Sequence, residues 1–103
     1  MELDDNKILE SLRDYVKKNP IKYWLEGKEI TPSNFKMTIP IRPFRKGDFL
    51  GGYNYFVSGR CNFDWEGFQG KEFMFECTLY VDTCNFTETV KKVKDNNINL
   101  KKI

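Results

Sequence analysis

The chain has 103 residues, of which 40% are hydrophobic and 16% aromatic, and its formal net charge is +2 at pH 7. This length suits a single domain over residues 1–103, and the apolar content is too high for a disordered chain. The chain contains no histidine, which excludes a Ser-His-Asp or Cys-His catalytic arrangement and histidine-containing zinc sites.

The compartment is predicted from the N-terminal segment and the cysteines. Residues 1–20 carry charges throughout and lack the apolar run of a signal peptide, and no later stretch approaches the ~20 apolar residues that span a bilayer. The three cysteines are an odd number, which fits reduced thiols inside a cell. We therefore expect a cytoplasmic protein without membrane contact. The abundance of Lys, Asn, Ile and Phe suggests an AT-rich source, bacterial, viral or protist.

The N-terminal segment has the apolar spacing of a helix. One face is formed by Ile8, Leu9, Leu12, Tyr15 and Val16. Asp4 or Asp5 can cap its start, and a lysine pair followed by Asn19-Pro20 suits its end. These signals predict a helix over about residues 5–18.

Residues 21–30 allow two interpretations. Ile21, Tyr23 and Leu25 alternate like a strand, whereas Pro20 and Gly27 would also frame a short helix. The alternation favours a short strand or hairpin.

Three later segments alternate apolar and polar residues over a longer range. Their apolar positions are Phe35, Met37, Ile39 and Ile41, then Tyr53, Tyr55, Val57, Cys61, Phe63 and Trp65, then Phe73, Phe75, Cys77, Leu79 and Val81. We predict three antiparallel strands. Pairing Ile41 with Tyr53 leaves residues 45–49 as one connection, and pairing Trp65 with Phe73 leaves residues 67–71 as the next.

The stretch at residues 41–56, rich in basic, glycine and aromatic residues, can be interpreted as a phosphate-binding loop or as a hairpin connection. Common phosphate loops lead from a strand into a helix. Here strand patterns lie on both sides, so the hairpin is favoured.

The C-terminal segment predicts a helix and a last strand. Thr87 can cap a helix over about residues 87–95 that turns Val90 and Val93 inward, and Ile98 and Leu100 then alternate like a strand. A strand, a crossover helix and a strand imply a parallel pair. The expected fold is α+β: an antiparallel sheet of about four to five strands, with an N-terminal and a C-terminal helix packed on one face.

The second face of the predicted sheet is mostly polar with embedded Phe56, Met74 and Tyr80. If both helices cover the opposite face, these side chains are exposed, as in a binding surface. The alternative is that the N-terminal helix or residues 21–34 fold over them.

An enzyme is not expected. The cysteine spacing does not resemble a zinc ligand set, and Cys84, the most plausible reactive thiol, has no base nearby in the sequence. Asp64 with Glu66, and Glu72 with Glu76, have the spacing of ordinary solvated pairs. We expect no catalytic residue, no metal and no cofactor.

Two non-catalytic functions remain. The first is a protein-binding module that blocks a partner enzyme, such as an inhibitor, an immunity protein or a phage anti-defence protein. The second is a nucleic-acid or nucleotide binder that stacks bases on aromatic side chains. Acidic residues beside those aromatics favour the first. The expected partner-binding residues are Arg42, Phe44, Arg45, Lys46, Phe56, Arg60, Glu76 and Tyr80.

Overall fold

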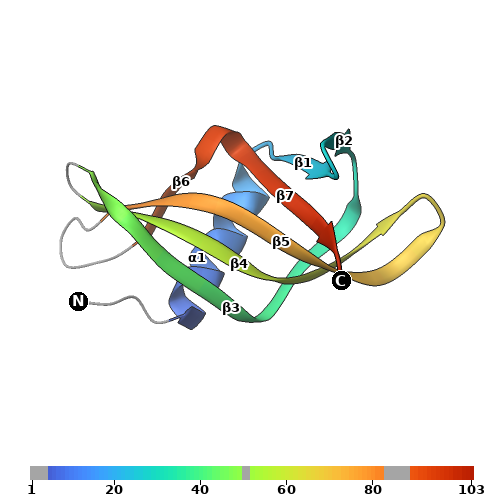
Figure 1. Ribbon diagram of the computed structural model, residues 1–103, viewed down its shortest axis with the longest axis horizontal. Helices are drawn as coiled ribbons and strands as arrows, with labels where there is room; N and C mark the ends of the chain where they lie inside the picture. Colours follow the sequence, from blue (N-terminus) through green and yellow to red (C-terminus); the bar gives the residue numbers. More distant parts are fainter. Residues whose placement is uncertain (1–4, 50–51, 83–88) are drawn as a thin grey trace.

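The computed structural model describes residues 5–49, 52–82 and 89–103, with the side chains of residues 6–38, 53–81 and 90–103. Across these ranges one α-helix packs against one curled, seven-stranded sheet (Figure 1). The strands run in the order β2-β1-β7-β5-β4-β3, and β6 pairs with β5. The elements are α1 (Asp5–Lys18), β1 (Lys22–Leu25), β2 (Lys28–Ile30), β3 (Ser33–Phe49), β4 (Gly52–Trp65), β5 (Phe68–Asp82), β6 (Thr89–Val93), the 3-10 turn η2 (Lys94–Asn96) and β7 (Asn97–Lys102).

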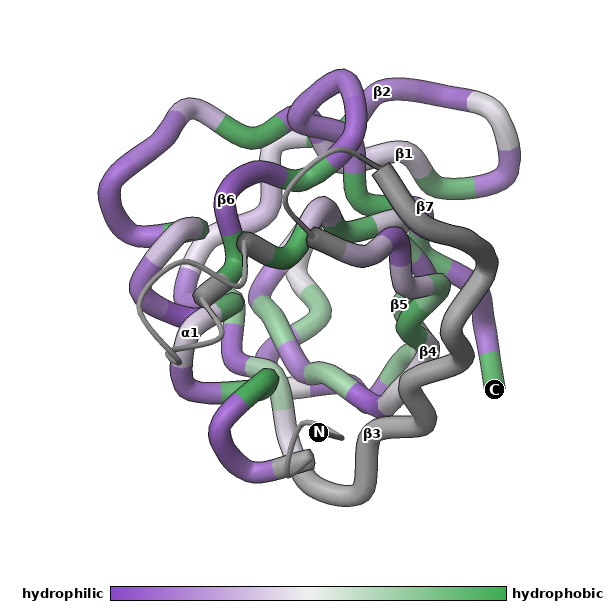
Figure 2. The backbone as a smooth tube through the Cα atoms, turned by 90° about the vertical axis from the view of Figure 1, so that its left-hand side faces the viewer, coloured by the Kyte–Doolittle hydropathy of each residue, from purple (hydrophilic) through white to green (hydrophobic). Residues whose placement is uncertain are grey.

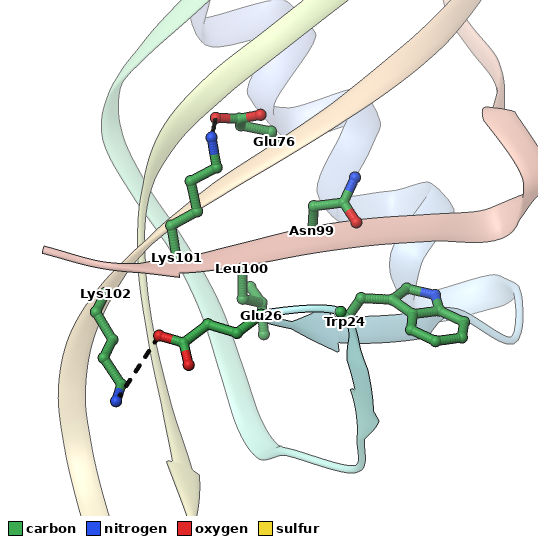
Figure 3. A pocket seen from close by; sticks show the side chains of 8 residues that line it. Trp24, Glu26, Glu76, Asn99, Leu100, Lys101 and Lys102 are labelled. Atoms are coloured by element: carbon green, nitrogen blue, oxygen red, sulfur yellow. Dashed lines mark ion pairs between the residues drawn. The ribbon is translucent and has the colours of Figure 1, made fainter.

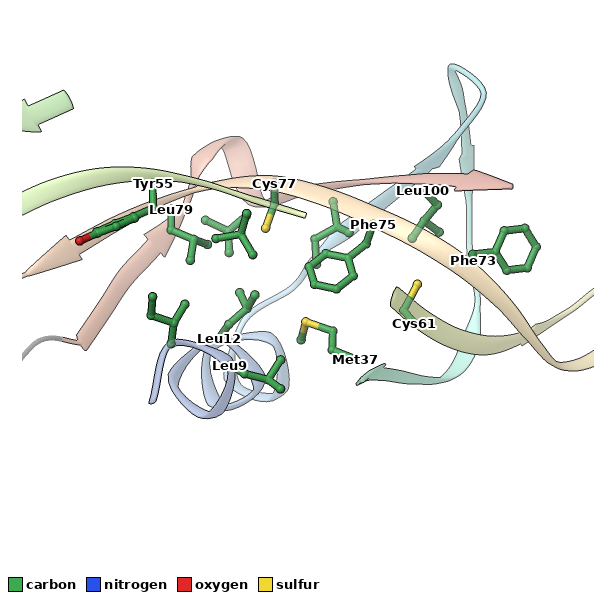
Figure 4. Packing of buried hydrophobic residues seen from close by; sticks show 14 of the residues in the cluster. Leu9, Leu12, Met37, Tyr55, Cys61, Phe73, Phe75, Cys77, Leu79 and Leu100 are labelled. Carbon is green, nitrogen blue, oxygen red and sulfur yellow. The ribbon is translucent and has the colours of Figure 1, made fainter. Parts of the chain in front are cut away.

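The helix predicted over residues 5–18 is confirmed as α1. It buries Ile8, Leu9 and Leu12 in the core, and Leu9 and Leu12 face the concave side of the sheet (Figure 4). At its end, the backbone N–H and the side-chain amide of Asn19 both donate to the carbonyl of Tyr15, at 3.0 and 2.9 Å. The side-chain amide of Asn19 thus adds a second hydrogen bond to a carbonyl in the last turn of the helix.

The ambiguous segment at residues 21–30 is a hairpin, as the alternation favoured. Strands β1 and β2 are joined by Glu26 and Gly27, whose φ angles are 51° and 79°. Two successive residues with positive φ are typical of a two-residue hairpin turn.

The predicted C-terminal helix is wrong, because residues 89–93 form the strand β6, antiparallel to β5. The reason lies in a register shift of one residue. Val93 lies opposite Leu79, and Val90 lies opposite Val81, so a spacing of three residues brings both valines to the same face of a strand. A β-bulge therefore imitates the spacing of a helix. Valine also favours strands through its branched side chain.

The expected parallel pair between the third predicted strand and the last strand is also wrong. Residues 97–102 do form a strand, β7, but it runs antiparallel to β5, continuing the line of β6 after η2. The sheet is nevertheless mixed, because β7 runs parallel to β1 on its other side. The fold therefore has one helix in the described ranges and a larger, mixed sheet in place of an antiparallel sheet with two helices.

The predicted strand register is wrong on both sides of β4. Ile41 lies opposite Gly59 and Trp65 lies opposite Phe68, so both predicted connections belong largely to strands. The hairpin of β4 and β5 turns at Glu66 and Gly67, whose φ angles are 45° and 81°. This is the same short turn as the one that joins β1 and β2. Three register shifts along β3 displace its pairing further. Because β3 and β4 pair antiparallel, residues 41–49 and 52–56 belong to two neighbouring strands, not to a strand leading into a helix.

The core lies between α1 and the concave side of the sheet. Viewed along the long axis, hydrophobic and hydrophilic positions alternate along the curled strands (Figure 2). The predicted division of faces holds for β4 and β5, where Val57, Phe63, Phe75 and Leu79 are almost fully buried. Two hydrogen bonds fix α1 over this core: the backbone N–H of Val90 donates to the Ser11 hydroxyl at 2.8 Å, and the Tyr15 hydroxyl donates to Asn96.

Candidate partner-binding surface

One face of the sheet points away from α1, and we call it the outer face. On β4 and β5 it consists of the even-numbered residues, which alternate with the buried ones. Strands β1 and β7 extend it. Its described members include Trp24, Thr38, Phe56, Ser58, Arg60, Asn62, Glu72, Met74, Glu76, Thr78, Tyr80, Asn99 and Lys101.

A single row of side chains crosses the outer face. Glu29 on β2 lies opposite Trp24 on β1, Trp24 opposite Asn99 on β7, Asn99 opposite Glu76 on β5, and Glu76 opposite Ser58 on β4. Neighbouring strands lie about 4.8 Å apart, so the row spans roughly 19 Å. The row thus places Trp24, from the N-terminal quarter of the sequence, next to Asn99, close to the C-terminus, and both lie beside the central strands β5 and β4.

A groove opens along this row, and we call it the Trp24 groove (Figure 3). Its volume is about 490 Å³. The indole N–H of Trp24 donates to Asn97 Oδ1 at 3.2 Å, which fixes the orientation of the ring. The groove is lined by Trp24, Glu26, Gly27, Glu76, Asn99, Leu100, Lys101 and Lys102.

Opposite charges are paired in and beside the Trp24 groove. Lys101 Nζ lies 2.6 Å from Glu76 Oε1, and Lys102 Nζ lies 3.8 Å from Glu26 Oε1. Pairs this exposed add little stability, but they neutralise the local field. The groove thus combines an oriented aromatic ring, an amide and paired charges without a strong net potential.

Four of the eight expected binding residues lie on the outer face. Phe56 and Tyr80 are half-buried, and the ammonium of Lys92 lies 4.9 Å from the centre of the Tyr80 ring. Arg60 is exposed and pairs with Glu72 at 3.1 Å, while Glu76 pairs with Lys101 as described above.

The other four expected residues, Arg42, Phe44, Arg45 and Lys46, have side chains outside the described part of the structure. Their backbone belongs to β3, where Phe44 lies opposite Phe56 and Arg42 opposite Ser58. Cys84, the thiol singled out above, also lies outside the described residues.

Neither segment considered as a cover for the outer face lies over it. Helix α1 packs on the concave side, and residues 21–34 form the β1–β2 hairpin and the start of β3, which widen the sheet. Of Phe56, Met74 and Tyr80, Met74 is the most exposed, at 38%. It lies opposite Arg60 on β4 and opposite Lys101 on β7.

Trp24 and Asn99 were missed by the sequence analysis. The alternation of Tyr23 and Leu25 does indicate that Trp24 points to the opposite face of a strand. Nothing in the sequence indicates that β1 pairs in parallel with β7, and this pairing creates the groove.

The described cysteines are poor nucleophiles. Cys61 and Cys77 are buried and free, and burial raises the pKa of both thiols to about 12. They therefore stay protonated at neutral pH. In the described parts of the chain, no cluster of three or more Cys, Asp or Glu side chains is arranged to hold a metal ion.

Comparisons of the chain with protein-family models, with curated proteins and with solved structures find no match. In the part that the structure describes, no helix is long and apolar enough to cross a membrane.

Proposed function

We propose that this protein is a non-catalytic protein-binding module that acts in the cytoplasm and engages its partner through the outer face, with the Trp24 groove at the centre of the contact. Its mode of action would be that of an inhibitor, an immunity protein or a phage anti-defence protein, which blocks an enzyme by occupying its surface. The oriented indole of Trp24 beside the amide of Asn99 is the observation that carries this proposal.

Buried aromatic anchors surrounded by polar groups dominate the energetics of many protein interfaces. Trp24 has this character, because its ring is half-buried and held by Asn97 while it borders an open groove. The ion pairs of Glu76 with Lys101 and of Glu26 with Lys102 supply hydrogen-bonding groups at the rim of the groove. Because each pair is neutral, neither pair attracts a highly charged polymer.

A nucleic-acid binder is less well supported. Three cations on or beside the outer face, Arg60, Lys101 and Lys102, are each paired with a glutamate. Binding to phosphates would break these pairs and leave the carboxylates beside the nucleic-acid backbone. These three ion pairs therefore favour a protein partner over a polyanion.

The proposal is tested by affinity capture from the source cells with the wild type and the variant Trp24→Ala as baits. Removing a central tryptophan anchor typically costs about 2 kcal/mol, or roughly 30-fold in affinity. We expect a protein that the wild type retains and Trp24→Ala loses.

Two further variants make the result specific. Asn99→Arg fills the groove from an exposed position and should also abolish capture, while Lys28→Ala, on β2 outside the groove, should leave it intact. Equal retention by all baits, or retention of nucleic acid in place of protein, would refute the proposal.

A further inference from the structure

A second groove lies where α1 meets β3, the edge strand at the opposite end of the strand order from β2. We call it the α1–β3 groove, and its volume is about 500 Å³. It is an open groove, comparable in volume with common ligand sites. Residues of the last turns of α1 form one wall, and residues 35–38 of β3 form the other.

The surface of this groove is apolar at its base and cationic at its rim. Met37 is buried, and Val16 and Phe35 are half-buried and pack against the core. Phe35 continues an aromatic column, with its ring centre 4.8 Å from that of Tyr23 and 6.2 Å from that of Phe63. The base is therefore held rigidly by the core.

The rim carries the exposed cations Arg13, Lys17 and Lys36. Within the described residues, no ion pair joins any of the three to a carboxylate. Lys36 contributes weakly to lowering the pKa of Asp64, and Glu10 and Asp14 lie near Arg13 in the sequence of α1 without pairing with it. The rim therefore presents three exposed cations, with which no described carboxylate forms an ion pair, above an apolar base.

Arg13 bridges the two walls, because its guanidinium donates to the backbone carbonyl of Met37. A guanidinium has five N–H donors in a planar fork, so this bond leaves donors free for a carboxylate. Arg13 is thus held in position for an anion at the edge of the groove.

We propose that the α1–β3 groove binds an acidic segment of a partner protein, in which apolar side chains enter the base and neighbouring carboxylates contact Arg13, Lys17 and Lys36. Charge complementarity requires an anionic partner, and the apolar base requires side chains that can be desolvated. The open shape suits a peptide lying along the helix and the strand. The inference is independent of the Trp24 groove.

The test uses fluorescein-labelled Asp-Phe-Asp-Leu-Asp, a matched peptide with Asn in place of Asp, and a matched peptide with Ser in place of Phe and Leu. Binding is followed by fluorescence anisotropy, and the site is mapped by amide chemical shifts in ¹⁵N-labelled protein. We expect saturable binding of the first peptide alone, with the largest shifts at Val16, Phe35 and Met37.

Matched protein variants separate the groove from overall charge. The double variant Lys17→Gln/Lys36→Gln should weaken binding by about tenfold or more. The double variant Lys28→Gln/Lys91→Gln removes the same charge from exposed positions outside the groove and should bind like the wild type.

Other outcomes would overturn the proposal. These are equal binding of the Asn peptide, equal weakening by both double variants, shifts centred on the outer face, or no saturable binding up to a concentration on the order of 1 mM. Stronger binding of laurate than of the acidic peptide at the same residues would assign the groove to a lipid instead.

Discussion

The two grooves differ in how they treat charge. In the Trp24 groove, lysines are matched to glutamates, and the oriented groups are an indole and an amide. In the α1–β3 groove, three cations surround an apolar base without a partner carboxylate among the described residues. A protein with a net charge of only +2 can therefore have one groove whose charges are paired and another whose cations form no ion pair among the described residues. Net charge alone says little about either.

The groove walls differ too. The Trp24 groove is built from three strands of the sheet, whereas the α1–β3 groove depends on the docking of a helix. Leu12, fully buried between α1 and the sheet, anchors that helix.

The largest expected effect is therefore that of Leu12→Ala, which should destabilise the fold by about 2 to 5 kcal/mol. The melting temperature should fall by at least about 8 °C. Hydrogen exchange should show α1 losing protection before β7, because only the α1–β3 groove loses a wall. The exposed helix variant Glu10→Ala serves as the control. A melting temperature of Leu12→Ala close to that of the wild type would mean that α1 does not contribute to the core.

An intermediate effect is expected from salt. Peptide affinity at the α1–β3 groove should fall steadily as NaCl increases, because its cations are exposed and form no ion pair with a described carboxylate, and because the screening length shrinks to about 8 Å at physiological ionic strength. Affinity of the partner captured through Trp24 should change little over the same series. Affinity at each groove is measured against NaCl concentration, by anisotropy for the peptide and by calorimetry for the captured partner. If both affinities fall with the same slope, the two grooves do not differ in charge as described.

The smallest effect is expected from Asp64, which ties the start of β3 to the β4–β5 hairpin. Its carboxylate accepts from the side-chain amide of Asn34 and from the backbone N–H of Gly70, both at 2.7 Å, and these bonds lower its pKa. A group with a lowered pKa stabilises the folded state above its ordinary pKa, and this contribution is lost as the pH falls through the folded value.

Acidification should therefore loosen the start of β3, next to Phe35 of the α1–β3 groove. The measurement is the protection factor of the Gly70 amide, which is its intrinsic exchange rate divided by its observed rate, from neutral to acidic pH. In Asp64→Ala this amide should lack protection at every pH. If the protection of the Gly70 amide depends on pH in Asp64→Ala as it does in the wild type, the Asp64 carboxylate does not hold the β4–β5 hairpin.

Much of the fold followed from local patterns. Apolar spacing located α1, and alternation located the hairpin at residues 21–30, the long strands, the last strand and the inward face of β4 and β5. These features depend on neighbours within a few residues, and a sequence displays such neighbours directly.

The errors arose where the structure depends on more than the local alternation of apolar and polar residues. A bulge gave Val90 and Val93 the spacing of a helix, and the two-residue turn at Glu66 and Gly67 allowed β4 and β5 to pair further than the expected connection at residues 67–71 permitted. The Trp24 groove depends on a parallel pairing between residues near opposite ends of the chain. Periodicity carries no information about which distant strands become neighbours, so Phe56 and Tyr80 were found as surface aromatics but Trp24 was not.

The central claim is that the Trp24 groove contacts a protein. Replacing Glu29, an exposed residue opposite Trp24 that borders the groove without lining it, by a photo-crosslinking phenylalanine analogue and irradiating the source cells tests it most directly, with the same analogue at Lys28 as the control position. The account predicts one protein adduct from position 29 that resists nuclease and is lost when Trp24→Ala is added. An adduct that nuclease removes, or the same adducts from both positions, would contradict it.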